Sequence, residues 1–222
     1  MKLQKILNRL QKLHPKEIDL SLGRVQNLCK KLGNPQDKLK CISIVGTNGK
    51  YSTIQALRAI LKEANINVNI YSSPHIQKIN ERFVYNDEEI SDENLAKLLM
   101  EVEEVNNGEP ITYFEILTAA YFYYAKNFNN INLIESGLFH RFDATNIIKE
   151  NLASIVTAIG FDHLDWLPEN EQTIEKIVFE KTSSLLNSKI IISNQNSSEI
   201  INIIKNNISH NNSKKIVYNE DF

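Results

Sequence analysis

The sequence contains only two cysteines, Cys29 and Cys41, and they do not form a C-x-x-C pair. Disulfide-rich secreted domains need several cysteines at short spacings, so this class does not fit the chain. We therefore expect reduced thiols and a cytoplasmic protein.

Long apolar runs and dense basic patches are missing as well. No run approaches the roughly 20 apolar residues that a membrane span requires. Residues 2–14 carry a charge every few positions, which predicts an amphipathic helix rather than a signal peptide. The formal net charge is -2, and the basic pairs Lys30-Lys31 and Lys214-Lys215 stand alone. We expect a monomer that binds neither a membrane nor nucleic acid.

Glycine is scarce, so a stretch with two glycines close together stands out. The chain has seven glycines in 222 residues, and two of them, Gly46 and Gly49, follow the apolar run 41–45. After Lys50, apolar residues return at helical spacing. A strand, a glycine turn and a helix form the context of a phosphate-binding loop, in which glycines let backbone N–H groups approach an anion. Lys50 would add a positive charge, and Ser52 or Thr53 a hydroxyl for Mg²⁺.

This loop does not meet the strict pattern G-x-x-x-x-G-K-[ST]. Ile44 stands where the pattern has its first glycine, and Tyr51 stands where it has Ser or Thr. Taken alone, the stretch could also be a turn in an unrelated α/β protein. The surrounding strand and helix favour a phosphate site.

Strands and helices alternate along the chain, which predicts a three-layer α/β fold with a mainly parallel sheet. The pattern fits one domain of 222 residues, with a helical segment at 1–38 before an α/β core at 39–222. A hairpin is expected around Asn86-Asp87. Expected strands are 41–45, 68–71, 131–134, 153–159, 189–193 and 215–218, and expected helices are 2–14, 24–32, 50–64, 91–105, 115–126, 171–185 and 198–207.

Polar residues follow several of these strands, at the edge where parallel sheets bind ligands. Ser73 follows the second strand, Glu135 ends the next one, and His163 follows another. A carboxylate buried at a strand end without a partner is costly, so Glu135 is best explained by function. Oxygen ligands suit Mg²⁺, whereas His163 is an unusual ligand for it and could equally be a hydrogen-bonding loop residue.

Seven motifs occur in an order that resembles a known enzyme family. They are G-T-N-G-K-x-S (46–52), Y-S-S-P-H (71–75), N-E-R (80–82), T-Y-F-E (112–115), E-x-G-x-x-x-R-x-D-A-T-N (135–146), D-H-x-x-x-L (162–167) and F-E-K (179–181). This series resembles folylpolyglutamate synthase/dihydrofolate synthase, the folate branch of the Mur ligases. The resemblance implies a P-loop domain of the Mur ligase central type and an ATP- and Mg²⁺-dependent ligase. Its substrates would be L-glutamate and dihydropteroate or a folate, joined through an acyl phosphate.

The resemblance also implies a role for individual residues. Nucleotide would bind at Gly46, Thr47, Asn48, Gly49, Lys50, Ser52 and Thr53. Magnesium would bind at Ser73, Glu135 and His163. Substrate would bind at Thr112, Phe114, Asp143, Ala144 and the loop Ile18–Val25, which contains Arg24. The catalytic residues would be Lys50, His163 and Lys181, the last being a lysine that is carbamylated in the family.

The sequence departs from the family pattern at several positions. Tyr51 replaces a small residue, and Phe139-His140 replaces a pair of glycines beside Glu135. We expect this chain to lack the family's C-terminal glutamate-ligase domain, for which the 222 residues hold no counterpart. The alternative function is therefore a truncated or degenerate relative that binds nucleotide or pterin without catalysis. A ligase acting on a cell-wall precursor is a weaker option, because the segments 112–115 and 143–146 favour a folate.

Overall fold

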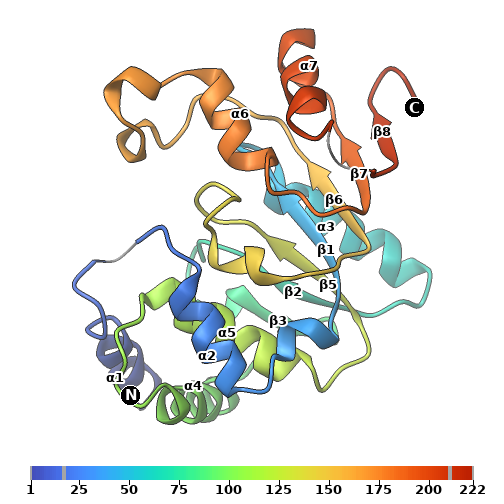
Figure 1. Cartoon of the computed structure of the whole chain (residues 1–222). Coiled ribbons are helices and arrows are strands. Elements are labelled where there is room, and N and C mark those ends of the chain that lie inside the picture. The colour runs from blue at the N-terminus through green and yellow to red at the C-terminus, as the bar shows by residue number, and fades with distance from the viewer. Residues whose placement is uncertain (1, 17–18, 210–211, 222) are drawn as a thin grey trace.

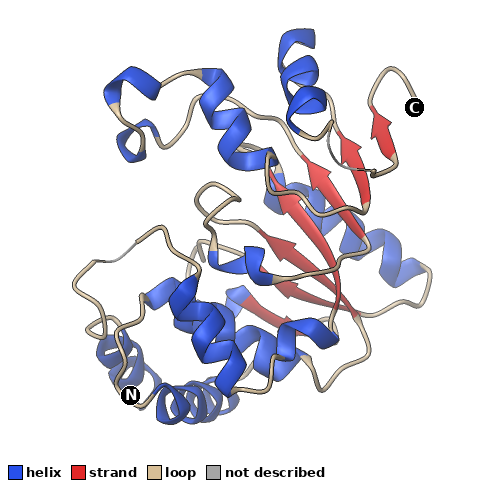
Figure 2. Cartoon of the chain, in the orientation of Figure 1, coloured by secondary structure: helices blue, strands red, loops and turns tan. Residues whose placement is uncertain are grey.

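The computed structural model describes residues 2–16, 19–209 and 212–221. Ile18, the first residue of the expected substrate loop, lies outside them. One eight-stranded sheet in the order β4-β3-β2-β5-β1-β6-β7-β8 runs through the described part of the chain (Figure 2). The strands are β1 (Lys40–Val45), β2 (Val68–Tyr71), β3 (Phe83–Tyr85), β4 (Glu88–Glu89), β5 (Ile131–Glu135), β6 (Ala153–Val156), β7 (Lys189–Ile192) and β8 (Lys215–Val217).

The sheet is parallel except at one edge. Strands β2, β5, β1, β6, β7 and β8 are paired in parallel, whereas β3 and β4 form an antiparallel hairpin. The turn of this hairpin lies at Asn86 and Asp87, which both have positive φ angles. The carboxyl ends of the parallel strands therefore meet at one edge, as the sequence predicts.

Helices cover both faces of the sheet, which makes three layers (Figure 1). Side chains of β1 alternate between the faces: Cys41 packs in the cluster that contains the N-terminal helices, and Ile44 packs against Ile54 of α3. Val45 belongs to a third cluster, with residues of α6 and α7. The helices are α1 (Lys2–Leu10), α2 (Gly23–Lys31), α3 (Lys50–Glu63), α4 (Asp92–Asn106), α5 (Tyr113–Ala125), α6 (Ile174–Thr182) and α7 (Ser198–Asn207).

The two helices before residue 38 pack on later parts of the chain. Helix α1 lies against α4, and α2 lies against α5, so all four helices share one apolar cluster (Figure 1). The division into segments 1–38 and 39–222 stays a prediction.

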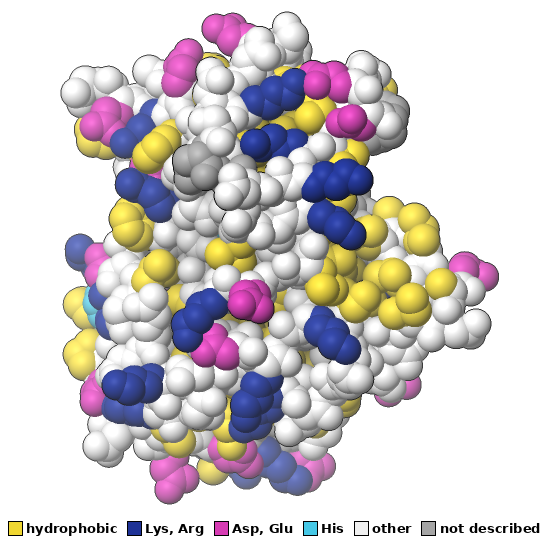
Figure 3. Space-filling model, turned by 45° about the vertical axis from the view of Figure 1, so that its right-hand side comes forward, with side chains coloured by type: hydrophobic (Ala, Val, Ile, Leu, Met, Phe, Trp, Pro, Cys, Tyr) yellow, Lys and Arg dark blue, Asp and Glu magenta, His cyan; other side chains and the backbone are white. Residues whose placement is uncertain are grey.

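The α3 face of the sheet keeps some apolar surface. Helix α3 packs on β1, β2 and β5, whereas Ile191 of β7 and Ile216 of β8 are half-buried and Leu152 is exposed. Figure 3 shows apolar side chains gathered in a patch on one side of the molecule. Among the described residues, no helix has the length and apolar character to cross a membrane.

Four expected boundaries are wrong, each for a local reason. The helix expected at 2–14 ends at Leu10, because the N–H groups of Lys12 and Leu13 donate to carbonyls three residues back, in turns that follow the helix. The strand expected at 153–159 ends at Val156, because the backbone beyond it bends to accept hydrogen bonds from residues 47 and 48. The helix expected from 115 begins at Tyr113, since Thr112 caps it. The helix expected at 171–185 covers only Ile174–Thr182, with Thr173 as its cap.

Candidate active site

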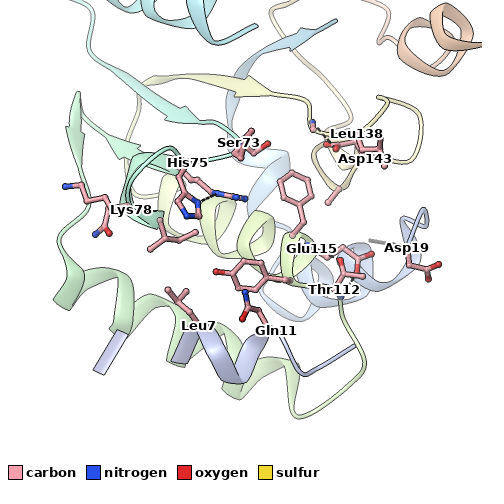
Figure 4. A pocket seen from close by; sticks show the side chains of 18 of the residues that line it. Leu7, Gln11, Asp19, Ser73, His75, Lys78, Thr112, Glu115, Leu138 and Asp143 are labelled. Carbon is pink, nitrogen blue, oxygen red and sulfur yellow. Dashed lines mark hydrogen bonds between the residues drawn. The ribbon is translucent and has the colours of Figure 1, made fainter. Parts of the chain in front are cut away.

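A cavity of about 820 Å³ opens at the carboxyl edge of the sheet. Its wall includes Lys50 at the start of α3, Ser73 after β2 and Asp143 beyond β5. Segments far apart in the sequence thus meet around one space, as Figure 4 shows for eighteen of the lining side chains. The cavity joins the expected phosphate loop to the expected substrate residues.

The loop between β1 and α3 is fixed by both of its glycines. Gly46 has a φ of +144°, and a Cβ there would collide with Thr157 Oγ1. Gly49 has a φ of +85° and precedes the first residue of α3. Because the first N–H groups of a helix have no partner within it, α3 presents donors and the positive end of its dipole to an anion.

Only part of this loop can serve as a backbone cradle. The N–H groups of Thr47 and Asn48 both donate to the carbonyl of Ala158, at 2.9 and 3.1 Å. The Thr47 hydroxyl in turn donates to the Gly160 carbonyl at 3.1 Å. These bonds tie the loop to the residues after β6, and among the described residues the N–H groups of Gly49 to Ser52 remain for a ligand, since that of Thr53 donates to the Gly49 carbonyl.

Two lysines converge on this loop. Lys50 Nζ donates to the carbonyls of Gly46 and Thr47, at 3.2 and 3.1 Å. Lys181 Nζ reaches the same Gly46 carbonyl at 3.2 Å, from α6. Lys181 is only 2% exposed, and burial together with the charge of Lys50 lowers its pKa to about 8. The structure therefore places both expected catalytic lysines at the phosphate loop.

Ser73 and Glu135 lie side by side at the ends of β2 and β5. The Ser73 N–H donates to Glu135 Oε2 at 3.2 Å. Burial raises the pKa of the Glu135 carboxyl, while the charges of Lys50 and Arg82 and the Ser73 N–H partly offset this rise. A hydroxyl beside a buried carboxylate is a donor set that suits Mg²⁺.

His163 lines the same cavity as Ser73 and pairs with its neighbour in the chain. Its Nε2 atom is 3.1 Å from Asp162 Oδ2, and its ring meets that of Phe139 edge to face, with 6.1 Å between the centroids. Burial and the charges of Lys181 and Lys50 lower its pKa, whereas Asp162 raises it. Within the described ranges, no three His, Cys, Asp or Glu side chains are grouped to hold a metal ion. Because Mg²⁺ prefers oxygen ligands, Ser73 and Glu135 suit this ion better than His163 does, and the metal role of all three residues stays a prediction.

At the other end of the cavity, Asp143 is buried and held in place. Its Oδ2 accepts the N–H of Gly137 at 3.0 Å, and its Oδ1 accepts the N–H and the hydroxyl of Thr145. Burial raises the pKa of this carboxyl to about 6. A Cβ on Gly137 would lie 2.9 Å from Asp143 Oδ2, so glycine there leaves room for the carboxylate.

An aromatic wall lies next to Asp143. Phe114 packs on Tyr71 with 6.0 Å between the ring centroids and an angle of 27° between the planes. Thr112, Phe114 and Ala144 all line the cavity beside Asp143. The four expected substrate residues other than Arg24 are thus brought together, and they suit a flat ring that carries N–H donors.

Arg24 has a different place. Its guanidinium donates to Asp19 Oδ2 at 2.8 Å and to Glu115 Oε2 at 2.9 Å, and Arg24 is not among the residues that line the cavity. Arg24 therefore holds the loop before α2 against the start of α5.

Glu115 is a cavity residue that the sequence argument passed over. Its Oε2 accepts the Thr112 N–H at 2.8 Å and its N–H donates to Thr112 Oγ1, which completes a capping box. Its Oε1 is buried and has no hydrogen-bond partner among the residues that the structure describes. The spacing T-x-x-E is the signal that would have identified the cap, and the unpaired oxygen is a ready acceptor for a ligand.

The departures from the family pattern have distinct environments. Tyr51 is 53% exposed in the first turn of α3. Phe139 is 2% exposed, and its ring lies 5.5 Å from Lys181 Nζ. His140 is buried with Nδ1 3.3 Å from Ser136 Oγ, and burial lowers its pKa to about 4. Both replacements of glycine are therefore built into the interior.

The sequence is similar to that of curated enzymes. No protein-family model matches the sequence. The dihydrofolate synthase/folylpolyglutamate synthase of Bacillus subtilis is 35% identical over 193 residues, covering 83% of this chain and 44% of that protein. The Escherichia coli enzyme of that name is also 35% identical, over 76% of this chain and 40% of its own length. The chain thus spans less than half of the length of these curated relatives.

Solved structures agree with the sequence matches. Escherichia coli FolC in complex with DHPP and ADP superposes with a TM-score of 0.85 at 30% identity, covering 97% of this chain and 51% of that one. A bifunctional folylpolyglutamate synthase/dihydrofolate synthase of Yersinia pestis, complexed with AMPPNP and a Mn ion, gives a TM-score of 0.85 at 28% identity. The resemblance and the α/β fold inferred from the sequence are confirmed.

Proposed function

We propose that this chain, which is related in sequence and fold to the N-terminal half of dihydrofolate synthase/folylpolyglutamate synthase, is the nucleotide- and pterin-binding part of an ATP-dependent ligase. The reaction would join L-glutamate to dihydropteroate or to a folate. The observation that carries this proposal is the single cavity that connects Lys50 with the buried Asp143.

Recognition of the pterin ring belongs to the Asp143 end. An aminopyrimidine ring offers N–H donors, and the carboxylates of Asp143 and Glu115 offer acceptors beside Phe114. The fixed position of Asp143, set by Gly137 and Thr145, avoids reorganisation when the ring binds.

The carboxylate of the bound substrate would then point toward Lys50. One of its oxygens attacks the γ-phosphorus of ATP, and ADP leaves. The amino group of glutamate next attacks the acyl phosphate carbon, and phosphate leaves with the carbon–nitrogen bond formed. Lys50 and the N-terminus of α3 would stabilise the charge on the transferred group.

Ser73 and Glu135 would hold Mg²⁺, which would supply positive charge to neutralise phosphate oxygens. We also propose that Lys181 and His163 act at the phosphate end, because both side chains lie close enough to Lys50 for its charge to lower their pKa values. A cytoplasmic location and a monomeric state belong to the same proposal, and two free, buried cysteines are compatible with a reducing compartment.

Calorimetric titration of the chain with Mg-ADP and with dihydropteroate tests the proposal directly. We expect both to bind, and we expect Lys50→Met to weaken Mg-ADP binding at least tenfold while dihydropteroate binding is kept. Failure of the chain to bind either ligand would contradict the proposal. A phosphate-release assay with ATP, dihydropteroate and L-glutamate, run on the same sample, then separates a ligase from a relative that only binds.

A further inference from the structure

We infer that Arg82 binds the acceptor carboxylate of the substrate, the group that receives the phosphoryl group. This inference rests on the proposed function and adds to it a residue that fixes the reacting end of the substrate. Arg82 ends the 3-10 helix Ile79–Arg82, directly before β3, and it lines the same cavity as Asp143 and Lys50.

The guanidinium of Arg82 has unused donors. Its Nε donates to His75 Nδ1 at 2.9 Å, the hydrogen bond drawn in Figure 4. Among the described residues, neither terminal nitrogen of Arg82 has a hydrogen-bond acceptor, and Arg82 forms no ion pair. The two terminal nitrogens can therefore donate to both oxygens of a carboxylate in the paired geometry that arginine favours.

The other cations that line the cavity are already engaged. Lys50 contacts two backbone carbonyls, Lys78 pairs with Glu89 at 2.7 Å, and His163 pairs with Asp162 at 3.1 Å. His75 accepts the hydrogen bond from Arg82, and burial together with the charge of Arg82 lowers its pKa, which favours the neutral form that can accept. Arg82 is thus the lining cation whose terminal nitrogens, within the described part of the chain, have no partner.

The position of Arg82 selects the acceptor carboxylate over other anions. The Ser72 N–H donates to the Arg82 carbonyl at 3.4 Å, which places Arg82 beside Ser73 on the metal side, and Arg82 lines the same cavity as Tyr113 on the pterin side. Arg82 therefore lies between the two ends of the cavity, where the carboxylate of a substrate held at Asp143 must arrive to meet the phosphate loop. A nucleotide at the loop would instead meet Lys50 first.

The loop that carries Arg82 is held by its own hydrogen bonds. The Glu81 carboxylate accepts three consecutive backbone N–H groups, those of Ile76, Gln77 and Lys78, at 2.8 to 2.9 Å. The Asn80 side chain donates to the Ile90 carbonyl at 2.8 Å. The backbone at Arg82 is fixed by these bonds, and its Nε is fixed by His75. Little conformational entropy is therefore lost when Arg82 binds a carboxylate.

The test compares two ligands and three proteins. Dihydropteroate and its analogue with a primary amide in place of the carboxylate are titrated calorimetrically into the wild type, Arg82→Gln and Arg9→Gln. Arg9 is a matched control because its guanidinium already pairs with Glu103 outside the cavity. We expect the wild type and Arg9→Gln to bind dihydropteroate at least tenfold more tightly than the amide, because a charge-assisted pair is lost. In Arg82→Gln the ratio should fall to within twofold of one.

Ratios of dihydropteroate to amide affinity that differ from these expectations overturn the inference. A ratio near one in the wild type, which needs no variant, or a tenfold ratio that persists in Arg82→Gln, refutes the role of Arg82 and leaves the proposed function standing. If the wild type binds neither pterin compound, the proposed function fails together with the inference. Mg-ADP affinity should be unchanged in Arg82→Gln, which shows that the site is folded, and Arg82→Lys should give an intermediate ratio. If Arg82→Gln does not fold, Arg82→Lys decides, and an unchanged ratio there counts against the inference.

Discussion

At the scale of single residues, Phe139 combines a buried ring with a backbone conformation that suits glycine. Its φ is +43°, in the left-handed region, where a Cβ costs roughly 1–2 kcal/mol. Its side chain is 2% exposed and borders both Lys181 and His163. The packing of the ring must therefore offset the backbone strain.

This balance predicts that glycine destabilises the protein less than alanine does at Phe139, the reverse of the order expected inside a helix. Both Phe139→Ala and Phe139→Gly should lower the free energy of unfolding by several kcal/mol, since the ring is lost. Glycine should be about 1 kcal/mol less destabilising than alanine, because it relieves the positive φ. Urea denaturation measures the difference. Phe122, buried within α5, is the control: there glycine should be worse than alanine by about 1 kcal/mol. Equal effects of the two substitutions at Phe139 would show that no strain is stored.

At the scale of elements, the start of α5 serves both the helix and the cavity. Thr112 caps the helix and also lines the cavity. Ser91 caps α4 in the same way, by accepting the Asn94 N–H, but it is absent from the cavity wall. The two caps therefore allow stability and binding to be separated.

Replacing each cap by alanine should have the same effect on stability and different effects on binding. Thr112→Ala and Ser91→Ala should each lower the free energy of unfolding by about 1 kcal/mol. Only Thr112→Ala should weaken dihydropteroate binding, because the position of Glu115 depends on its capping box. Urea denaturation and calorimetry on both variants make the comparison. Equal loss of binding in Ser91→Ala would mean that helix stability, not the local geometry, controls the site.

Part of the fold and of the site could be predicted from the sequence. The order of strands and helices followed from apolar periodicity, and the polar strand ends indicated the edge where Lys50, Ser73 and Glu135 meet. The end of β6 did not follow, since residues 157–160 bend to bind the phosphate loop, which is a contact between distant segments. The position of Arg24 did not follow either, for the same reason, and its role in substrate binding stays a prediction. Its partners Asp19 and Glu115 cannot be paired from spacing alone.

At the scale of the whole molecule, Lys181 connects two parts of the sheet. Its backbone is in α6, which packs with α7, while its amine reaches Gly46 after β1. Burial and the charge of Lys50 lower its pKa from 10.5 to about 8. The folded protein therefore releases this proton more readily than the unfolded chain does.

We expect the free energy of unfolding to depend on pH because Lys181 titrates differently in the folded and unfolded states. Between about pH 8 and 10.5 the unfolded chain keeps the proton and the folded protein does not, so the free energy of unfolding rises with pH. The contribution of Lys181 to the free energy of unfolding is complete above pH 10.5. It is lost as the pH falls through about 8, where the folded protein takes up the proton. Relative to Lys181→Met, the wild type should gain up to about 3 kcal/mol across this window. Urea denaturation at several pH values, in carbonate-free buffer because a neutral amine adds CO₂, measures the gain. Parallel curves for the two proteins would show that the amine is not desolvated in the folded state.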